Sequence, residues 1–344
     1  MRLLRFGRRT IILSLAPLAL TAFLAGCATI PKEVLDTDPA SLLETAPQVY
    51  VRLSGTALRD IARGMDEEEL GILALAVSRE SGNEKEAPAP SSLQETGAGS
   101  TGMKTSMLKG FLAKTGTFGA GIRGIGTSAP AMEAVLIGDF PVISLRLALA
   151  VDGYWKKTEA GGFRSVKYPI FLRPPQEGII HASTESVPPP RSLSPVEAYP
   201  RRFSGLSGSD IFISVNTPGA FFAGSLPLEA SSIPLGSIIV SGRRIEPDLT
   251  VPGGTQGTSV PGTPAPEARY LLDVHILMKD EATAKAYKPV VKFLWTAAAG
   301  RIFGGFLDLS AAPLVLENDV YTVRGIEADA AELRAMITAP MLGY

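Results

Sequence analysis

The stretch VYVRL at residues 49–53 is where the folded part of this 344-residue chain is expected to begin. Its side chains alternate along the chain and Ser54-Gly55 ends it, so it predicts a β-strand with one buried face. A stretch of the same character, IFISV at residues 211–215, opens the second half of the chain. The two stretches indicate that the sequence consists of two halves that begin alike.

The elements expected after these two strands in the sequence also recur. In the first half we expect paired strands at 134–138 and 143–151 and a hairpin over 166–183; in the second half, paired strands at 237–241 and 269–278 and a hairpin over 314–324. Helices are predicted at 56–63, 106–114 and 328–337. The pattern predicts an α+β fold of two similar units, with antiparallel or mixed sheets and packed helices. Internal duplication explains the recurrence, and so does the ordinary recurrence of α+β elements.

Composition predicts the segments that separate these units. We expect a signal peptide at 1–26, a tether at 27–48, a first unit at 49–186, a Pro-rich linker at 187–208 and a second unit at 209–344. Two low-complexity segments, 83–106 and 251–267, are predicted to be a mobile loop and an insertion. They carry too little apolar surface to offset the entropy lost on ordering.

The amino-terminal residues have the features of an export signal. Four arginines within the first nine residues precede an apolar run from Ile11 to Ala25, which is shorter than the ~20 residues a spanning helix needs. The run ends in Leu24-Ala25-Gly26-Cys27, which resembles the lipobox of bacterial lipoproteins. The resemblance implies cleavage between Gly26 and Cys27, a diacylglyceryl group on the Cys27 thiol, and in most cases acylation of the new amino terminus.

The cysteine count supports lipid attachment over an ordinary secretory signal with a stray thiol. Cys27 is the only cysteine, so no disulfide forms within the chain. A free thiol in an oxidising compartment is a liability, whereas an acylated one has a use. Two or three acyl chains attach a protein permanently. In enteric-type lipoproteins Ala28, in place of Asp, favours the outer over the inner membrane.

Charge and histidine content exclude several function classes. Without residues 1–26 the chain has 318 residues, with 29 basic and 34 acidic side chains and a net charge of −5. A mildly acidic surface argues against nucleic-acid binding. With His181 and His275 as its two histidines, the chain is not expected to build a histidine metal site, and no cofactor is expected.

Three short motifs resemble the active-site set of penicillin-binding proteins and serine β-lactamases. They are Ser106-Met107-Leu108-Lys109, Ser81-Gly82-Asn83 and Lys114-Thr115-Gly116. Their order along the chain differs from that family's, and Lys109 and Lys114 are too close in sequence to face each other across a cleft. We interpret the set as coincidental, and predict a protein that is not an enzyme.

Residues 119–124 (GAGIRG) fit the G-x-G-x-x-G pattern of dinucleotide sites, and Asp139 follows twenty residues after the first glycine. Such a site needs a strand before the glycines and a long helix after them. Gly126 and Pro130 forbid that helix, so a flexible turn is predicted.

Weaker candidates are two histidines and an aromatic pair. His275 shares an expected strand face with Asp273 and is predicted to face solvent. His181 has Glu177 and Glu185 as its carboxylates near in sequence, and is the weaker candidate of the two. Tyr154-Trp155 indicates packing or a binding surface.

A long helix is predicted from Glu281 to about Phe303, capped by Asp280 and kinked or ended at Pro289. Its apolar stretch, residues 290–307, is hydrophobic nearly all round. Such a helix is buried, or it lies in a membrane or lines a hydrophobic pocket.

These observations predict a non-enzymatic lipoprotein of the cell envelope that acts as a protein-binding or assembly scaffold. The alternative is a carrier or binder of a lipid or other hydrophobic ligand, using residues 290–307. A scaffold should have a filled core and an exposed apolar patch, whereas a carrier should have a continuous apolar cavity.

Overall fold

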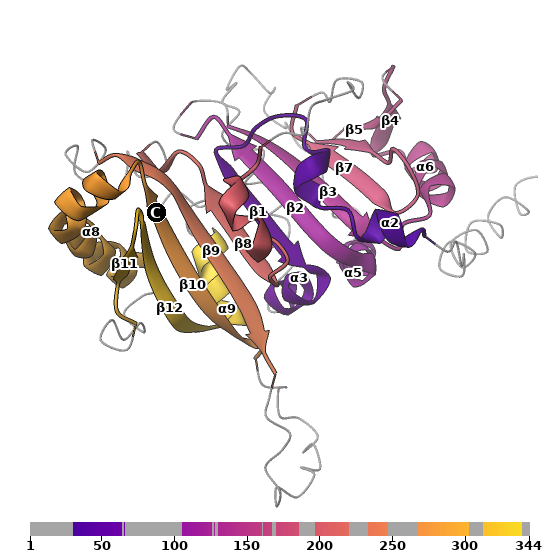
Figure 1. The fold of residues 1–344 in the computed structure, drawn as a ribbon. Coiled ribbons are helices and arrows are strands. Elements are labelled where there is room, and N and C mark those ends of the chain that lie inside the picture. The colour runs from indigo at the N-terminus through magenta and orange to yellow at the C-terminus, as the bar shows by residue number, and fades with distance from the viewer. Residues whose placement is uncertain are drawn as a thin grey trace, which may run out of the picture.

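One antiparallel sheet of twelve strands runs through both halves of the chain (Figure 1). The computed structural model describes residues 30–63, 65, 105–125, 127, 130–159, 161–166, 170–185, 197–219, 233–246, 267–302 and 312–338. The strands are β1 (Val49–Ser54), β2 (Thr115–Arg123), β3 (Ala131–Gly138), β4 (Trp155–Lys157), β5 (Phe163–Ser165), β6 (Phe171–Arg173), β7 (Ile179–Ser183), β8 (Ile211–Val215), β9 (Leu235–Ile245), β10 (Arg269–Met278), β11 (Val315–Glu317) and β12 (Val320–Asp329).

The strand order is β11-β12-β10-β9-β8-β1-β2-β3-β7-β6-β5-β4. The two strands that open the halves, β1 and β8, are neighbours at the centre, with Val49 opposite Val215 and Leu53 opposite Ile211. Outward from β1 lie β2, β3, β7 and β6, and outward from β8 lie β9, β10, β12 and β11. The predicted α+β class is confirmed, as one continuous sheet.

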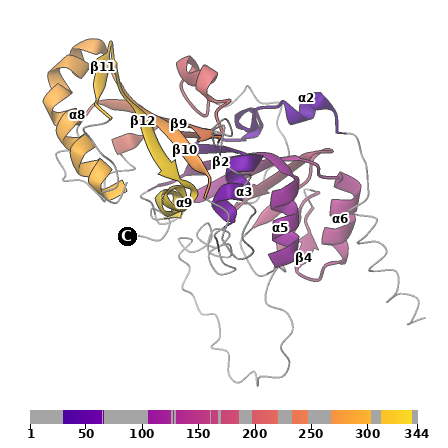
Figure 2. The ribbon, with the colours of Figure 1, turned by 90° about the horizontal axis from the view of Figure 1, so that it is seen from below.

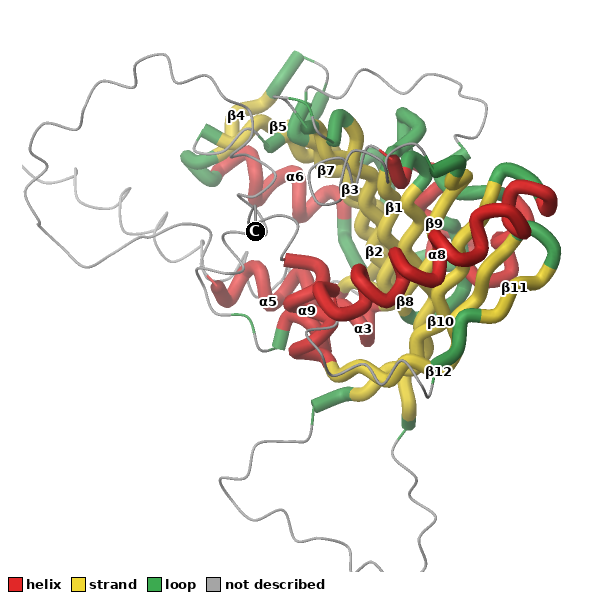
Figure 3. The backbone as a smooth tube through the Cα atoms, turned by 90° about the vertical axis from the view of Figure 1, so that its left-hand side faces the viewer, coloured by secondary structure: helices red, strands yellow, loops and turns green. Residues whose placement is uncertain are grey.

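The helices complete the fold. They are α2 (Lys32–Leu35), the 3-10 helix η1 (Pro39–Leu42), α3 (Gly55–Ala62), α5 (Thr105–Lys114), α6 (Val142–Val151), the 3-10 helix η2 (Arg201–Leu206), α8 (Glu281–Ile302) and α9 (Ala330–Thr338). Helices α3, α5, α6 and α9 lie on one face of the sheet, and α2 lies on the other (Figure 2). Helix α8 runs along the end of the sheet formed by β10 and β12, and α3 contacts both α5 and α9 (Figure 3).

Each face of the sheet has its own core. Under α3, α8 and α9, buried side chains such as Leu53, Tyr270 and Leu272 form the larger cluster. On the opposite face, Tyr50 and Phe212 lie in a cluster with residues that belong to the segments 30–48 and 197–206. Those two segments were predicted to be a tether and part of a linker. Instead they cover the second face of the sheet, and Pro39 begins η1 rather than breaking structure.

Residues 142–151 form the helix α6 where a strand was predicted. The apolar residues at 143, 145, 147, 149 and 151 alternate as in a strand. In the helix they separate into two faces, because residues four apart lie on the same side. Leu145 and Leu149 are buried, whereas Ile143, Leu147 and Val151 are 77%, 59% and 76% exposed.

The predicted helices at 56–63, 106–114, 281–303 and 328–337 match α3, α5, α8 and α9 within a few residues. Asp280 caps α8 as predicted, because its Oδ1 accepts a hydrogen bond from the Thr283 amide at 2.7 Å. Pro289 lies inside α8 without ending it. The two predicted hairpins are present as β6–β7 and β11–β12.

Candidate functional site

The segment 30–48, here named the strap, crosses the outer face of β2 and β3. Two glycines of β2 make room for its prolines. A Cβ added to Gly119 would lie 2.4 Å from Cβ of Pro39, and one added to Gly121 would lie 3.0 Å from Cβ of Pro47. Glycine in a strand interior commonly marks such a close approach of another chain segment.

The G-x-G-x-x-G pattern therefore has a structural explanation. Its first two glycines lie in β2 and receive the strap, so the prediction of a flexible turn over 119–124 is wrong. Gly124, with φ of +69°, follows the end of the strand. Asp139 lies 4.0 Å from Nζ of Lys114. The sheet partner β3 follows these glycines where a dinucleotide site needs a helix.

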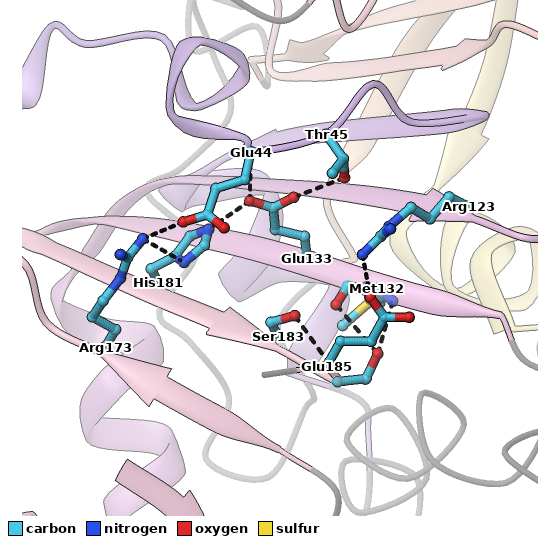
Figure 4. A network of polar contacts seen from close by, with 10 residues as sticks. Glu44, Thr45, Arg123, Met132, Glu133, Arg173, His181, Ser183 and Glu185 are labelled. Carbon is cyan, nitrogen blue, oxygen red and sulfur yellow. Dashed lines mark hydrogen bonds and ion pairs between the residues drawn. The ribbon is translucent and has the colours of Figure 1, made fainter. Parts of the chain in front are cut away.

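A buried polar network joins the strap to the sheet (Figure 4). Glu133 of β3 and His181 of β7 are each less than a tenth exposed, and Nε2 of His181 lies 2.7 Å from Oε1 of Glu133. The strap contributes the backbone N–H of Glu44, which donates to Oε1 of Glu133 at 2.6 Å, and the hydroxyl of Thr45, which donates to Oε2 at 3.3 Å. Arg173 of β6 donates to the Glu44 carboxylate at 2.5 Å.

The sheet register places these side chains together. Arg173 lies directly opposite His181 in the β6–β7 pair, and Glu133 lies opposite Ser183, two residues along the β3–β7 pair. Nη2 of Arg173 lies 3.4 Å from Nδ1 of His181. The two ring nitrogens of His181 therefore face different groups, Nε2 the carboxylate of Glu133 and Nδ1 the guanidinium of Arg173.

Glu133 is ionised in this arrangement. Burial by itself raises the pKa of its carboxyl group. The hydrogen bonds from His181, the Glu44 amide and Thr45 outweigh burial, so the net direction of the pKa is downward. Two of these three donors, the Glu44 amide and the Thr45 hydroxyl, belong to the strap. The strap and the charge on Glu133 therefore stabilise each other.

A second set of contacts holds the strap at Asp38. The hydroxyl of Tyr199 donates to Oδ2 of Asp38 at 2.6 Å, and that of Tyr50 lies 3.4 Å from Oδ1. Burial and the Asp38 carboxylate raise the pKa of both tyrosines. The rings of Tyr50, Tyr199 and Phe212 contact one another, with centroids 4.9–6.3 Å apart. Asn216 ties the strap to the segment beside it, since its amide donates to the carbonyls of Pro47 and Ala198.

Sequence reasoning missed His181 as a member of this network. Its carboxylate partner, Glu133, is 48 residues away in the sequence, and no local pattern connects them. The one signal available was the pair of strands, at 134–138 and 178–183, whose pairing would bring residues 133 and 181 together.

His275 is half-buried, so the prediction of a solvent-facing side chain is wrong. Its ring lies 5.6 Å from the ring of Phe203 in η2, and Nδ1 lies 3.3 Å from the hydroxyl of Thr322. Among the described residues, Nε2 is buried without a hydrogen-bond partner. Burial lowers the pKa of this imidazole. The segment that covers it had been predicted to be linker.

Three residues of the serine and lysine motifs lie on one helix. Ser106, Lys109 and Lys114 follow one another along the single helix α5. Ser81 and Asn83 lie outside the described residues, as do Gly26, Cys27, most of the predicted loop 83–106 and nearly all of the insertion 251–267.

Two helices expose apolar side chains. Ile143, Leu147 and Val151 form a stripe along the outer side of α6, here named the α6 stripe, and Tyr154 beyond it is 47% exposed. Helix α8 is not buried all round. Val291 and Trp295 pack into the core, whereas Phe293 is 70% exposed. Residues 303–307 of the predicted apolar stretch lie outside the described residues.

Within the described ranges, no cluster of three potential ligands could hold a metal ion. No helix of that part of the chain combines the length and the hydropathy needed to cross a membrane.

Comparison with known proteins identifies a fold and no family. No family model matches the chain, and no curated protein matches it. The solved structure "Structure of crystal form III of TP0453" matches with a TM-score of 0.51 and 13% identity, covering 88% of this chain and 99% of that one. Crystal form I of TP0453 matches with a TM-score of 0.50 at 13% identity, covering 89% and 98%. At this identity the likeness concerns the fold alone.

Proposed function

We propose that this chain is a non-enzymatic lipoprotein of the bacterial cell envelope, anchored through acylated Cys27. Of the two membranes, we favour the outer over the inner. In this proposal it serves as a protein-binding or assembly scaffold. The α6 stripe is the observation that carries the proposal, because a scaffold presents an exposed apolar patch on a filled core. Its partner is an envelope protein with a complementary apolar surface.

The position of the strap supports presentation of this surface at the membrane. Ile30, three residues after Cys27, lies against Gly178, where an added Cβ would be 2.8 Å from Cγ2 of Ile30. Gly178 is hydrogen-bonded to Phe140, and neighbouring Glu177 accepts from the amide of Val142 in the first turn of α6. Ile30, the first described residue after Cys27, therefore lies close to the start of α6.

We also propose that the two halves arose by internal duplication. The order of elements around the central β1–β8 pair supports this, because α6 follows β3 just as α8 follows β10. Strands β7 and β12 then occupy matching places outside β3 and β10. The apolar face of α6 and the exposed Phe293 of α8 lie on equivalent helices in this scheme.

Two measurements test the proposed function. Mass spectrometry of the amino-terminal peptide should detect Cys27 carrying a diacylglyceryl group, and Cys27→Ser should move the protein from the membrane to the soluble fraction. A photo-crosslinking residue in place of Leu147 should then give a discrete adduct with one envelope protein in intact cells. The same residue at Lys285, on α8, is the control.

Two outcomes contradict the scaffold. Adducts with lipid alone at position 147 would show that the bilayer covers the α6 stripe. Equal yields of the same protein adduct from positions 147 and 285 would show that contact is non-specific. The carrier alternative requires a cavity lined by residues 290–307, yet Val291 and Trp295 of that stretch are packed in the core.

A further inference from the structure

The strap lies on a sheet that is complete without it. Strand β2 is paired with β1 from Thr117 to Ile122 and with β3 over its whole length. The strap adds a layer over β2 and β3 and takes the place of none of these strand pairings. Its departure would therefore uncover the sheet without interrupting it.

The polar side chains under the strap keep contacts with one another when it is absent, although Arg173 loses the Glu44 carboxylate. His181 contacts both Glu133 and Arg173, and all three belong to sheet strands. The strap supplies the Glu44 carboxylate, the Glu44 N–H and the Thr45 hydroxyl, each of which water can replace. Desolvation of the Glu44 and Arg173 side chains offsets part of the attraction between them. Release of the strap also exposes Ala40 and Leu43, which are 5% and 2% exposed in the core of this face, so apolar burial as well as polar contacts stabilises the docked position.

The strap also decides how far the body can lie from the membrane. With the strap docked, three residues, 27–29, separate it from the proposed anchor, and three residues span at most about 11 Å. With the strap released, residues 27–48 are free and reach at most about 75 Å.

We propose that the strap is a releasable latch. Docked through the Glu44–Arg173 pair and the hydrogen bonds from Glu44 and Thr45 to Glu133, it holds the body at the membrane surface. Released, it becomes a tether that lets the α6 stripe reach a partner at a distance. The change in reach rests on the proposed lipidation of Cys27, whereas docking and release do not.

Hydrogen exchange followed by mass spectrometry on the full-length lipoprotein in liposomes tests the latch. Glu44→Ala removes the strap carboxylate that pairs with Arg173. Glu133→Gln removes the charge of the sheet carboxylate that accepts hydrogen bonds from Glu44 and Thr45 of the strap. Both should raise exchange at amides 40–48 at least tenfold and leave β2 and β3 unchanged. Glu185→Gln is the matched control, because Glu185 pairs with Arg123 near the same strands and makes no contact with the strap among those described.

Two results would overturn the latch. One is that amides 40–48 exchange together with β2 and β3 in every variant, so that the strap opens only when the whole sheet unfolds. The other is equal exchange in Glu44→Ala, Glu133→Gln and Glu185→Gln. Intact-mass measurement of Cys27 in the same samples separates these results from failure of the anchor.

A disulfide provides the converse experiment. Cβ of Pro47 and a Cβ added at Gly121 are 3.0 Å apart, so the backbones must separate by roughly 0.5–1 Å to reach the ~3.8 Å typical of a disulfide. In the double variant Pro47→Cys/Gly121→Cys, oxidation should suppress exchange of amides 40–48 at least tenfold, and reduction should restore it. Unchanged exchange on oxidation, with the disulfide verified by mass, would show that the strap does not open.

Discussion

The buried carboxylate of Asp60 in α3 accepts a hydrogen bond from the hydroxyl of Tyr270 in β10, 210 residues later, at 2.9 Å. Nε of Arg244 in β9 lies 3.0 Å from the same carboxylate oxygen. Burial and Asp60 together raise the pKa of Tyr270, which stays protonated as the donor. A helix of the first half is thereby fixed to strands of the second.

We predict that Asp60→Ala lowers the free energy of unfolding by about 3–5 kcal/mol, because it leaves the hydroxyl of Tyr270 and part of Arg244 without their partner. Tyr270→Phe should cost about 1–2 kcal/mol. Asp319→Ala is the control. It removes the exposed pair with Arg202 and should cost less than about 1 kcal/mol. Urea unfolding measures all three; equal losses for the two aspartates would contradict the prediction.

Two glycine substitutions test whether Gly119 of β2 makes room for the strap. Gly119→Ala places a Cβ 2.4 Å from Pro39 and should destabilise the protein by about 1–3 kcal/mol, as overpacking does. Gly110→Ala in α5 meets nothing within 4 Å and should stabilise by about 0.5–1 kcal/mol, because alanine favours a helix. Thermal unfolding should show opposite shifts in Tm. A lower Tm in both variants would mean that the strap does not explain Gly119.

Stability should depend on the ionisation of His275. Its pKa in the folded protein is lowered by burial, below the unfolded value of about 6.5. The unfolded chain therefore binds more protons as the pH falls through about 6.5, and stability declines from there towards the folded pKa. Asp273 and Glu317 oppose the shift and Arg324 supports it. In His275→Gln this part of the decline between pH 7.5 and 5 should vanish. The free energy of unfolding is measured with urea at each pH. If it falls in parallel for the variant and the wild type, the ionisation of His275 does not contribute to the decline.

The α6 stripe should be dispensable for folding. Leu147→Gln is predicted to change the free energy of unfolding by no more than about 0.5 kcal/mol, because residue 147 is exposed. Leu149→Gln, two residues on and buried, should cost about 2–5 kcal/mol. The scaffold requires Leu147→Gln to weaken cross-linking to the partner while the protein stays folded, which circular dichroism verifies. A strongly destabilised Leu147→Gln would place this residue in a core instead.

The parts of the fold that sequence predicted are those with a single strong signal. Residues 269–278 alternate over ten positions and form β10 at the predicted bounds. Residues 142–151 were misassigned because an alternating apolar pattern in a helix with two apolar faces resembles a strand. Residues 116–123 were misassigned because glycine carries no side-chain periodicity, although its absence of a side chain is what the strap requires.

The candidate site was largely beyond sequence reasoning. Its members come from the strap, β3, β6 and β7, and their pairing depends on sheet register. The strap itself looked like a tether, because three prolines in residues 30–48 predict broken structure when no surface is known to receive them. Its docking depends on Gly119 and Gly121, about 80 residues away.

The ends of the sheet limit how this molecule can associate. Its outermost strands, β4 and β11, are three residues long, and β4 carries Lys156 and Lys157. Short, charged edge strands disfavour the addition of further strands from another molecule. Growth of the sheet by edge-to-edge pairing is thus discouraged at both ends.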